Sequence, residues 1–377
     1  MFLVPLFFPM DAVRLDQRFD TWYIIGMYMH ATISTREELE HHLVLTEDES
    51  RWFEANGDTL PLLISTYYLS LMNPGDPDDP IRRQVVPSIR GMDRIGLEQM
   101  DPLAEISHSV LPRLIHRYRN RVAFLVTDRC ATYCRHCFRR RFTATECSHV
   151  SESELDAVAA YVHDHAEVRE MLLTGGDPLT LSDERLMQVI TAIRNARPDL
   201  VLRLCSRMPA TFPQRITDDL IARLKPHTCS ALYLMTQFNH PKEITRQSVQ
   251  AVARFIDAGI PVMNQTVLLR GVNDDASVLE HLMNLLVANR VKPYYLFQGD
   301  LVSGTAHLRV PLEKGLELES VLRSRLSGLA MPQYAIDLPE GGGKVPLGRS
   351  YLEGKDESGT WMFRTVSGEP RNYPDPD

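Results

Sequence analysis

Three cysteines of this 377-residue chain lie within eight residues, in the order Cys130-Ala-Thr-Tyr-Cys134-Arg-His-Cys137. Three thiolates on one short loop suit either a zinc site or an iron–sulfur cluster. A structural zinc site needs four ligands, and the candidates for the fourth, His136 and Cys147, are awkwardly placed. Three cysteine ligands on a four-iron cluster instead leave one iron open to a small molecule. The spacing therefore favours a 4Fe-4S cluster over a non-catalytic zinc-binding module.

The use of cysteine also indicates the compartment. The chain has six cysteines, and three of them form the tight cluster. A secreted disulfide scaffold spreads its cysteines along a short chain, whereas a tight cluster in a long chain is typical of metal binding in a reducing environment. We therefore expect a cytoplasmic protein, and we expect Cys147, Cys205 and Cys229 to be ordinary buried thiols.

Composition and charge exclude several classes of protein. Hydrophobic residues make up 44% and charged residues 24%, which excludes a disordered chain. Lys+Arg 41 against Asp+Glu 49 gives a net charge of −8, so nothing indicates a nucleic-acid partner. No apolar run reaches about 18 residues, so we expect no membrane contact. The first ten residues, MFLVPLFFPM, are predicted to be an apolar arm that packs on the body or on a partner.

The beginning of the chain has the pattern of short helices joined by irregular segments. Ser34-Thr-Arg-Glu37 and Thr46-Glu-Asp-Glu49 are capping-box patterns that begin helices. The stretch NPGDPDDP, residues 73–80, cannot hold regular structure and is predicted to be a loop. We therefore expect residues 1–104 to form a helical N-terminal arm.

From about residue 121, short apolar runs alternate with amphipathic stretches of helical period. The runs are Val122–Thr127, Met171–Leu173, Val201–Cys205, Leu232–Met235, Val262–Leu269 and Tyr294–Phe297. One helix should begin at the capping box Ser151-Glu-Ser-Glu154, and another should run from Glu243 to Ala258. Strands that are apolar on both faces are typical of a parallel sheet. Six such units predict an α/β fold, a partial (β/α)6 TIM-type barrel over residues 105–335.

Polar and glycine-rich residues follow these strands, where each strand ends. The cysteine cluster follows the first strand, residues 174–178 the second, residues 206–209 the third, residues 236–240 the fourth, and Gly299-Asp300 the sixth. The carboxyl ends of parallel strands meet at one end of a barrel, which is where such enzymes place their active sites. The sequence therefore predicts an enzyme.

Several motifs resemble those of one family. The segment His116–Phe142, HRYRNRVAFLVTDRCATYCRHCFRRRF, is similar to the lysine 2,3-aminomutase family of radical S-adenosylmethionine (SAM) enzymes, as are TGGDPLTLSDERL, FNHPKEIT, NQTVLLRGVND and DLPEGGGKVPL. The resemblance extends from about residue 35 to the end. It implies an isomerase with a 4Fe-4S cluster, SAM and pyridoxal 5'-phosphate (PLP), which moves an amino group from C2 to C3 of an amino acid. It also implies an electron donor such as flavodoxin or ferredoxin, and a homo-oligomer.

The resemblance assigns roles to individual residues. Lys344, in a C-terminal segment of residues 336–377, corresponds to the lysine that forms a Schiff base with PLP, although GGGK alone would indicate only a flexible loop. Arg139 corresponds to the residue that pairs with the substrate α-carboxylate. The residues implied to hold the PLP phosphate are Arg117, Tyr118 and Arg121. Those implied to bind SAM are Gly175, Gly176, Asp177, Gln237 and Gln265.

The choice of substrate depends on two acids. Asp300 and Asp337 correspond to the pair that binds the side-chain ammonium in the lysine enzymes, so we expect a small amino acid with a cationic side chain, L-lysine giving β-lysine. Arginine also has a cation at the end of its side chain, so the sequence leaves arginine as an alternative substrate. A lysine on a protein such as elongation factor P also stays open, because Gln237 replaces a family histidine and Glu340 a glycine. Asp275 stands where the lysine enzymes have a zinc-binding cysteine, so no structural zinc is expected.

Overall fold

The computed structural model describes residues 32–55, 60–93, 96, 98–374 and 376. The apolar arm predicted at the start of the chain lies outside these residues. Among the helices that are described, none is long and apolar enough to cross a membrane.

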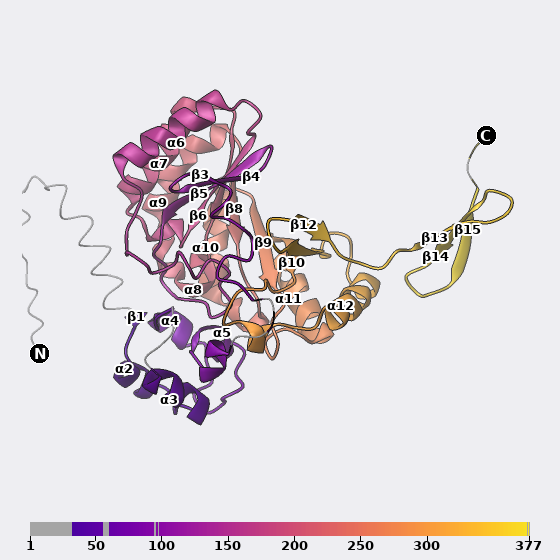
Figure 1. Cartoon of the computed structure of the whole chain (residues 1–377), viewed down its shortest axis with the longest axis horizontal. Helices are drawn as coiled ribbons and strands as arrows, with labels where there is room; N and C mark the ends of the chain where they lie inside the picture. The colour runs from indigo at the N-terminus through magenta and orange to yellow at the C-terminus, as the bar shows by residue number, and fades with distance from the viewer. Residues whose placement is uncertain (1–31, 56–59, 94–95, 97, 375, 377) are drawn as a thin grey trace, which may run out of the picture.

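One ten-stranded sheet forms the body of the molecule (Figure 1). Its strands, in chain order, are β3 (Ser109–Leu111), β4 (Leu114–Tyr118), β5 (Arg121–Thr127), β6 (Glu170–Gly175), β7 (Val201–Cys205), β8 (Leu232–Thr236), β9 (Val262–Val267), β10 (Lys292–Phe297), β11 (Gln333–Leu338) and β12 (Gly343–Pro346). Neighbours in the sheet follow the chain order, and every pair from β5 to β11 is parallel. Strands β3, β4 and β12 add antiparallel edges.

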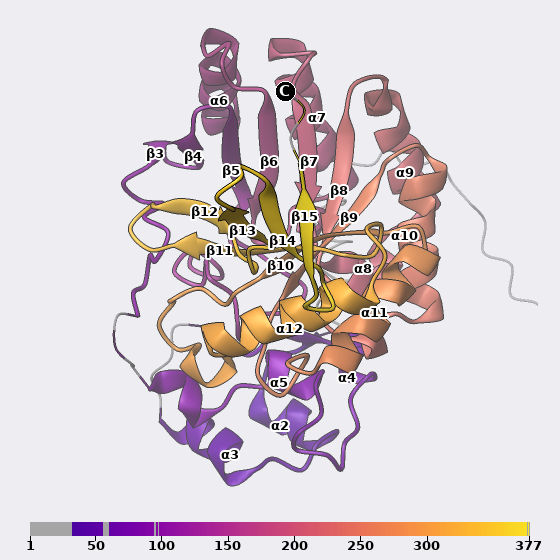
Figure 2. The same ribbon diagram turned by 90° about the vertical axis from the view of Figure 1, so that its right-hand side faces the viewer.

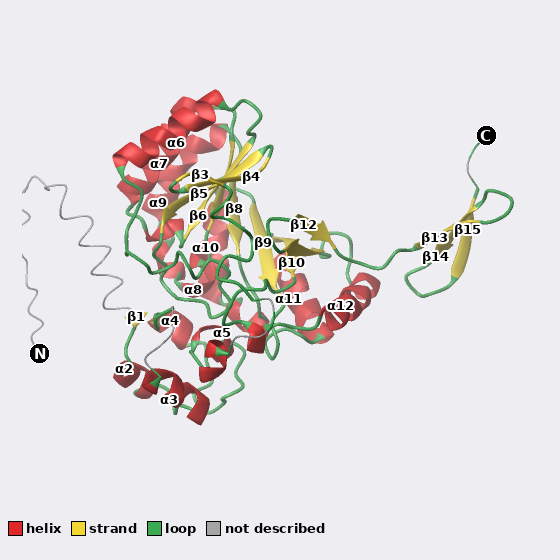
Figure 3. Ribbon diagram, viewed as in Figure 1, coloured by secondary structure: helices red, strands yellow, loops and turns green. Residues whose placement is uncertain are grey.

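A helix connects each pair of consecutive parallel strands. These helices are α6 (Glu152–Asp164), α7 (Asp183–Ala196), α9 (Asp218–Leu224), α10 (Arg246–Asp257), α11 (Ala276–Ala288) and α12 (Leu312–Arg325). They lie along the outer side of the curved sheet (Figure 2 and Figure 3). The six predicted strand–helix units are therefore confirmed as a partial barrel, and β11 adds one further parallel strand.

Burial on both faces explains why these segments are strands. In β5 the consecutive residues Phe124, Leu125 and Val126 are all buried, and Leu173 of β6 belongs to the same core cluster as Phe124. Consecutive apolar side chains point to opposite faces of a strand, so both faces of the sheet are covered, one by helices and one by the barrel interior.

The capping-box predictions are confirmed at two helices and wrong by one residue at a third. Thr46 and Ser151 each cap a helix, α3 (Glu47–Glu54) and α6, with the predicted glutamate reaching back to the cap. Helix α2 (Arg36–Glu40) is capped by Thr35 rather than Ser34, because it is the Glu38 side chain that accepts from the N–H of Thr35. Helix α10 begins at Arg246 rather than Glu243, because Thr245 caps it.

The N-terminal region contacts the cysteine loop through backbone hydrogen bonds. It contains short helices, α4 (Thr66–Leu69) and α5 (Arg82–Val85) among them, and a pair of two-residue strands, β1 (Thr32–Ile33) and β2 (Ile64–Ser65), that the sequence did not predict. The N–H of Tyr133 donates to Leu63 at 2.8 Å, and the N–H of Arg135 donates to Gln84 at 2.7 Å. Two backbone hydrogen bonds thus attach the cysteine loop to two separate segments of the N-terminal region.

The end of the chain forms a separate small sheet. Strands β13 (Leu352–Lys355), β14 (Trp361–Arg364) and β15 (Pro370–Tyr373) pair with one another, and they lie apart from the body at the end of an extended connection (Figure 1).

Candidate active site

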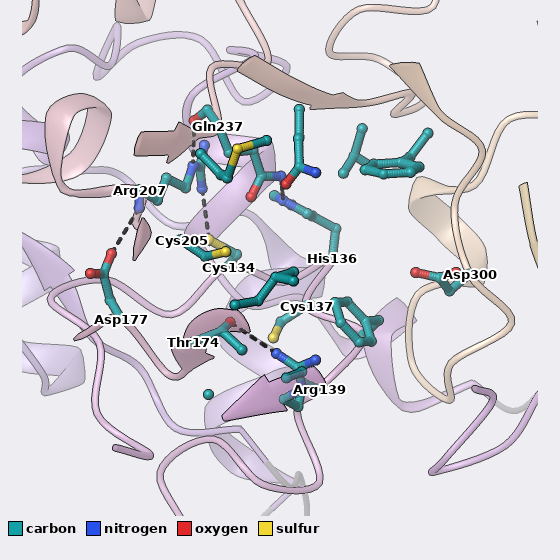
Figure 4. A pocket seen from close by; sticks show the side chains of 18 of the residues that line it. Cys134, His136, Cys137, Arg139, Thr174, Asp177, Cys205, Arg207, Gln237 and Asp300 are labelled. Carbon is teal, nitrogen blue, oxygen red and sulfur yellow. Dashed lines mark hydrogen bonds between the residues drawn. The ribbon is translucent and has the colours of Figure 1, made fainter. Parts of the chain in front are cut away.

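A cavity of about 380 Å³ opens at the carboxyl ends of the parallel strands. Its size suits a small ligand. In Figure 4, Asp177 and Asp300 lie on opposite sides of Cys134 and Cys137. The residues to which the sequence analysis gave a cluster, cofactor or substrate role all line this cavity: Arg117, Tyr118, Arg121, Cys130, Cys134, Cys137, Arg139, Gly175, Gly176, Asp177, Gln237, Gln265, Asp300, Asp337 and Lys344.

The cysteine loop presents its three thiols to this cavity. Burial raises the pKa of the Cys130 thiol well above its ordinary value and also raises the pKa of Cys137. Thiolates here therefore need a bound positive charge to compensate for lost hydration. Among the described residues, no three His, Cys, Asp or Glu side chains lie close enough together to hold a single metal ion. In a 4Fe-4S cluster each cysteine binds a different iron, so separate thiols around a cavity fit this group.

Two glycines at the end of β6, Gly175 and Gly176, allow the cavity wall to lie close to the segment that leads to the cysteine loop. A Cβ atom on Gly175, whose φ is +116°, would lie 2.4 Å from the carbonyl oxygen of Thr127. A Cβ atom on Gly176 would lie 2.1 Å from the carbonyl oxygen of Arg129. A side chain at either position would push the chain away from the segment of residues 127–129 that leads to Cys130.

Asp177 joins the ends of two neighbouring strands. Its Oδ2 accepts hydrogen bonds from the Ser206 hydroxyl at 3.0 Å and from the N–H of Arg207 at 2.8 Å, while Oδ1 accepts from the N–H of Leu179 at 3.0 Å. Burial raises the pKa of Asp177 to about 6, and these hydrogen bonds act in the opposite direction. The carboxylate thus organises the loop after β7 as well as lining the cavity.

Gln237, which replaces a histidine of the resembled family, contacts His136 in the cysteine loop. The amide Nε2 of Gln237 lies 3.1 Å from Nε2 of His136. Burial lowers the pKa of His136 well below its ordinary value, and the positive charge of Arg207 lowers it further. A neutral His136 that carries its proton on Nδ1 can accept this hydrogen bond at Nε2. A glutamine amide can always donate here, whereas a histidine would need the right tautomer.

Lys344 on β12 lies beside the three residues implied to hold the PLP phosphate. The Tyr118 hydroxyl accepts hydrogen bonds from the N–H of Lys344 at 2.9 Å and from Arg117 Nη2 at 2.7 Å. The guanidinium carbon of Arg121 lies 3.7 Å from the centre of the Tyr118 ring. Two guanidinium groups and a phenol next to a primary amine fit a phosphate-bearing aldehyde.

The hairpin of β11 and β12 explains the spacing between Asp337 and Lys344. The two residues are direct partners in the antiparallel ladder, so their side chains project from the same face. Lys344 Nζ donates to one oxygen of Asp337, and Arg117 Nη2 donates to the other at 2.9 Å. Nζ also lies 4.0 Å from the centre of the Phe297 ring. A lysine ammonium is therefore already bound to Asp337.

Asp300, at the end of β10, faces the same cavity. Burial and the nearby carboxylate of Asp337 raise the pKa of Asp300 to about 7, although Lys344 and Arg117 act in the opposite direction. Ionised Asp300 is thus unfavourable without a further cation.

Arg139 is held by Glu105, a buried residue that sequence reasoning missed. Nε of Arg139 donates to one Glu105 oxygen at 2.9 Å, and Nη2 donates to the other at 2.5 Å. Nη1 donates to the Thr174 hydroxyl at 3.1 Å (Figure 4). Arg141 donates to Glu105 as well, at 3.1 Å. Glu105 therefore fixes one edge of the Arg139 guanidinium and leaves the Nη1 side toward the cavity.

Glu340 stands where the resembled family has glycine, and its backbone adopts a conformation that is unfavourable for a residue with a side chain. Its φ of 57° lies in the left-handed region that favours glycine. Its N–H donates to Pro102 at 3.1 Å, so the loop before Lys344 is fixed to the segment that carries Glu105.

Known proteins resemble this chain over almost its whole length. A family model described as the radical SAM superfamily matches residues 124–283, and one described as lysine-2,3-aminomutase matches residues 319–377. The chain is 42% identical over 345 residues to the L-lysine 2,3-aminomutase of Acetoanaerobium sticklandii, which covers 92% of this chain and 83% of that protein. The L-lysine 2,3-aminomutase of Bacillus subtilis is 40% identical and covers 92% of this chain and 73% of its own length. The glutamate 2,3-aminomutase of Clostridioides difficile is 38% identical to this chain, and the match covers 93% of this chain and 82% of that protein.

The first prediction concerns the cysteine loop. Replacing Cys130, Cys134 or Cys137 by alanine should remove most bound iron and the brown colour of anaerobically purified protein, because each thiolate would hold its own iron. Cys147→Ala is the control. Its thiol, predicted to be buried, is in fact exposed, as is that of Cys229, and this variant should keep its iron. Full iron content in any of the three loop variants would exclude that cysteine as a ligand.

Proposed function

The chain belongs to the lysine 2,3-aminomutase family of radical SAM enzymes, and we propose from this that it converts L-lysine to β-lysine by moving the amino group from C2 to C3. The family works with a 4Fe-4S cluster, SAM and PLP, so the protein is an isomerase that uses these cofactors. The reaction on lysine also requires a one-electron donor, for which flavodoxin or ferredoxin is suitable. We also propose that the chain acts as a homo-oligomer in the cytoplasm.

Sequence identity does not choose the substrate, because the relatives named for lysine and for glutamate are almost equally similar to this chain. The observation that carries the proposal is the ion pair between Asp337 and the Lys344 ammonium, in a part of the cavity where the carboxylate of Asp337 also raises the pKa of Asp300. This part of the cavity already accommodates a lysine side chain. A glutamate side chain would instead bring a further negative charge beside two partly buried carboxylates, of which Asp337 is already paired with Arg117 and Lys344.

The residues of the chain would hold the cofactors as follows. Lys344 would bind the aldehyde of PLP, and Cys130, Cys134 and Cys137 would bind the cluster. The phosphate of PLP would lie against Arg117, Tyr118 and Arg121. SAM would lie against Gly175, Gly176, Asp177, Gln237 and Gln265. When bound, the cluster and SAM supply a radical that removes a hydrogen atom, and PLP supplies the conjugated group that carries the amino group during its migration.

The protein itself positions the substrate at its two ends. Arg139, with its guanidinium edge fixed by Glu105, would bind the α-carboxylate through the Nη1 side. Asp300 and Asp337 would bind the distal ammonium, so the length of the side chain between the two anchors places C3. Because Glu105 holds Arg139 and Arg117 holds Asp337 before the substrate binds, little orientational freedom of these two groups remains to be lost on the way to reaction.

The activity assay tests the proposal directly. The reconstituted chain is incubated anaerobically with SAM, PLP, a reductant and one amino acid at a time, and NMR detects a β-amino acid. Lysine should react best and glutamate not at all. A preference for glutamate or alanine would overturn the proposal. A preference for arginine would keep the acidic pair but change the substrate, and activity only on a lysine of a protein such as elongation factor P would identify a protein substrate.

A further prediction concerns Lys344. Lys344→Ala should abolish the PLP absorbance that borohydride can trap on the protein, because the amine that binds the aldehyde is gone. Iron content should stay at the wild-type level, since Lys344 lies on β12 and the cysteine loop follows β5. Wild-type trapping in this variant would show that another lysine binds PLP.

The raised pKa of Asp300 predicts how stability depends on pH in the cofactor-free chain. The folded pKa of about 7 lies above the ordinary value of 3.8, so the folded protein holds a proton that the unfolded chain has released. The resulting stabilisation is complete below pH about 4 and is lost as the pH rises through 7, by up to about 1 kcal/mol per pH unit. Asp300→Asn should remove this loss.

Urea unfolding at several pH values checks this expectation. The variant should gain stability relative to wild type between pH 5 and pH 7. Glu357→Gln, which removes an exposed acid from the turn between β13 and β14, should not. Parallel profiles for wild type and Asp300→Asn would contradict the assignment.

A further inference from the structure

Arg207, at the end of β7, donates a hydrogen bond to a cysteine of the loop. Its Nη1 lies 2.7 Å from the sulfur of Cys134 (Figure 4). The side chain is only 9% exposed. The proposed function gives this arginine no role, although the Ser206-Arg-Met-Pro209 pattern at the end of a strand marks its position in the sequence.

The rest of the guanidinium is fixed by three buried side chains from distant segments. Nη2 donates to Glu243 at 2.6 Å, to Gln84 at 2.6 Å and to the Tyr68 hydroxyl at 2.9 Å. Nε donates to the carbonyl oxygen of Gln237 at 3.3 Å. Because the contacts come from the N-terminal region and from the loop after β8, the guanidinium cannot turn away from Cys134 without breaking several of them.

The partners of Arg207 are themselves fixed. The fully buried carboxylate of Glu243 accepts from the Tyr68 hydroxyl at 2.7 Å and from the N–H of Asn239 at 2.5 Å. The amide of Asn239 donates to Gln84 at 2.9 Å. The arginine and Glu243 together carry no net charge, but their arrangement is polar, with N–H groups directed at the sulfur.

A different buried arginine shows that this arrangement is not a general feature of the fold. Arg215 donates to the carbonyl oxygens of Leu179 and Leu181, at 2.7 and 3.0 Å, and pairs with Asp183. It fixes a loop through backbone groups. Arg207 instead directs a charged donor at a thiol that the proposed function assigns to the cluster.

We infer that Arg207 is a positioning residue that makes the cluster easier to reduce, by donating a charged hydrogen bond to the sulfur of Cys134. Reduction adds one electron, supplied by an external one-electron reductant, and part of the added negative charge resides on the sulfur ligands. Hydrogen bonds to these sulfurs and a nearby positive charge stabilise the reduced cluster more than the oxidised one. Arginine stays protonated, so no proton moves with the electron. This inference rests on the proposed cluster ligands, but not on the substrate.

The test is the midpoint potential of the cluster, measured by redox titration with EPR detection in the absence of SAM, PLP and amino acid. Arg207→Gln should shift the potential downward. Arg207→Lys should shift it less, because lysine keeps the charge but loses the planar geometry. Arg215→Lys, the matched buried control, should leave it unchanged. An unchanged potential in Arg207→Gln at full iron content would overturn the inference, and weaker SAM binding with an unchanged potential would assign Arg207 to SAM instead.

Removing the arginine alone leaves the carboxylate of Glu243 buried without its partner. This unpaired charge can destabilise the fold or reduce the amount of cluster that the protein binds. The double variant Arg207→Met/Glu243→Gln removes both charges together and should also lower the potential. A potential equal to wild type in this variant, with iron bound, would overturn the inference. If wild-type protein itself held no 4Fe-4S cluster, its iron content would show that the proposed function, rather than the role of Arg207, had failed.

Discussion

Charged side chains line the cavity, several of them buried, and an unpaired buried charge is costly. The structure meets this constraint with internal ion pairs: Arg139 with Glu105, Arg207 with Glu243, and Lys344 with Asp337. In each pair one group faces the cavity or its cysteine loop, and its partner restrains it before any ligand binds. Asp300 is the exception, because burial and the neighbouring carboxylate of Asp337 raise its pKa to about 7 and make its ionised form unfavourable.

The sheet and the lining of the cavity could be predicted because both follow from local patterns. A run such as Val122–Thr127 is apolar on both faces, which only a strand in a parallel sheet satisfies. Such strands bring their carboxyl ends together, so residues as far apart as Cys130, Asp177 and Asp300 had to meet. The roles of single residues came from a family resemblance, and the geometry of the cavity is compatible with them.

The partners of these residues could not be predicted, because each partner lies far away in the sequence. Glu105 stands in a loop with no local pattern, and it matters only because Arg139 reaches it. The pattern around Arg207 was visible, but its role depends on Tyr68 and Gln84, which belong to another region. The seven-residue spacing between Asp337 and Lys344 acquires a meaning only once the hairpin makes them neighbours.

The backbone hydrogen bonds between the cysteine loop and the N-terminal region have a consequence for folding. Tyr133 pairs with Leu63, and Arg135 pairs with Gln84, across large separations in the chain. Contacts of high sequence separation form slowly, because a long loop must close before they contribute. The loop of Cys130–Cys137 therefore acquires its final shape only after the N-terminal region has packed against it. Loading of metal into this protein is thus coupled to the docking of that region, rather than to the order of one short peptide segment.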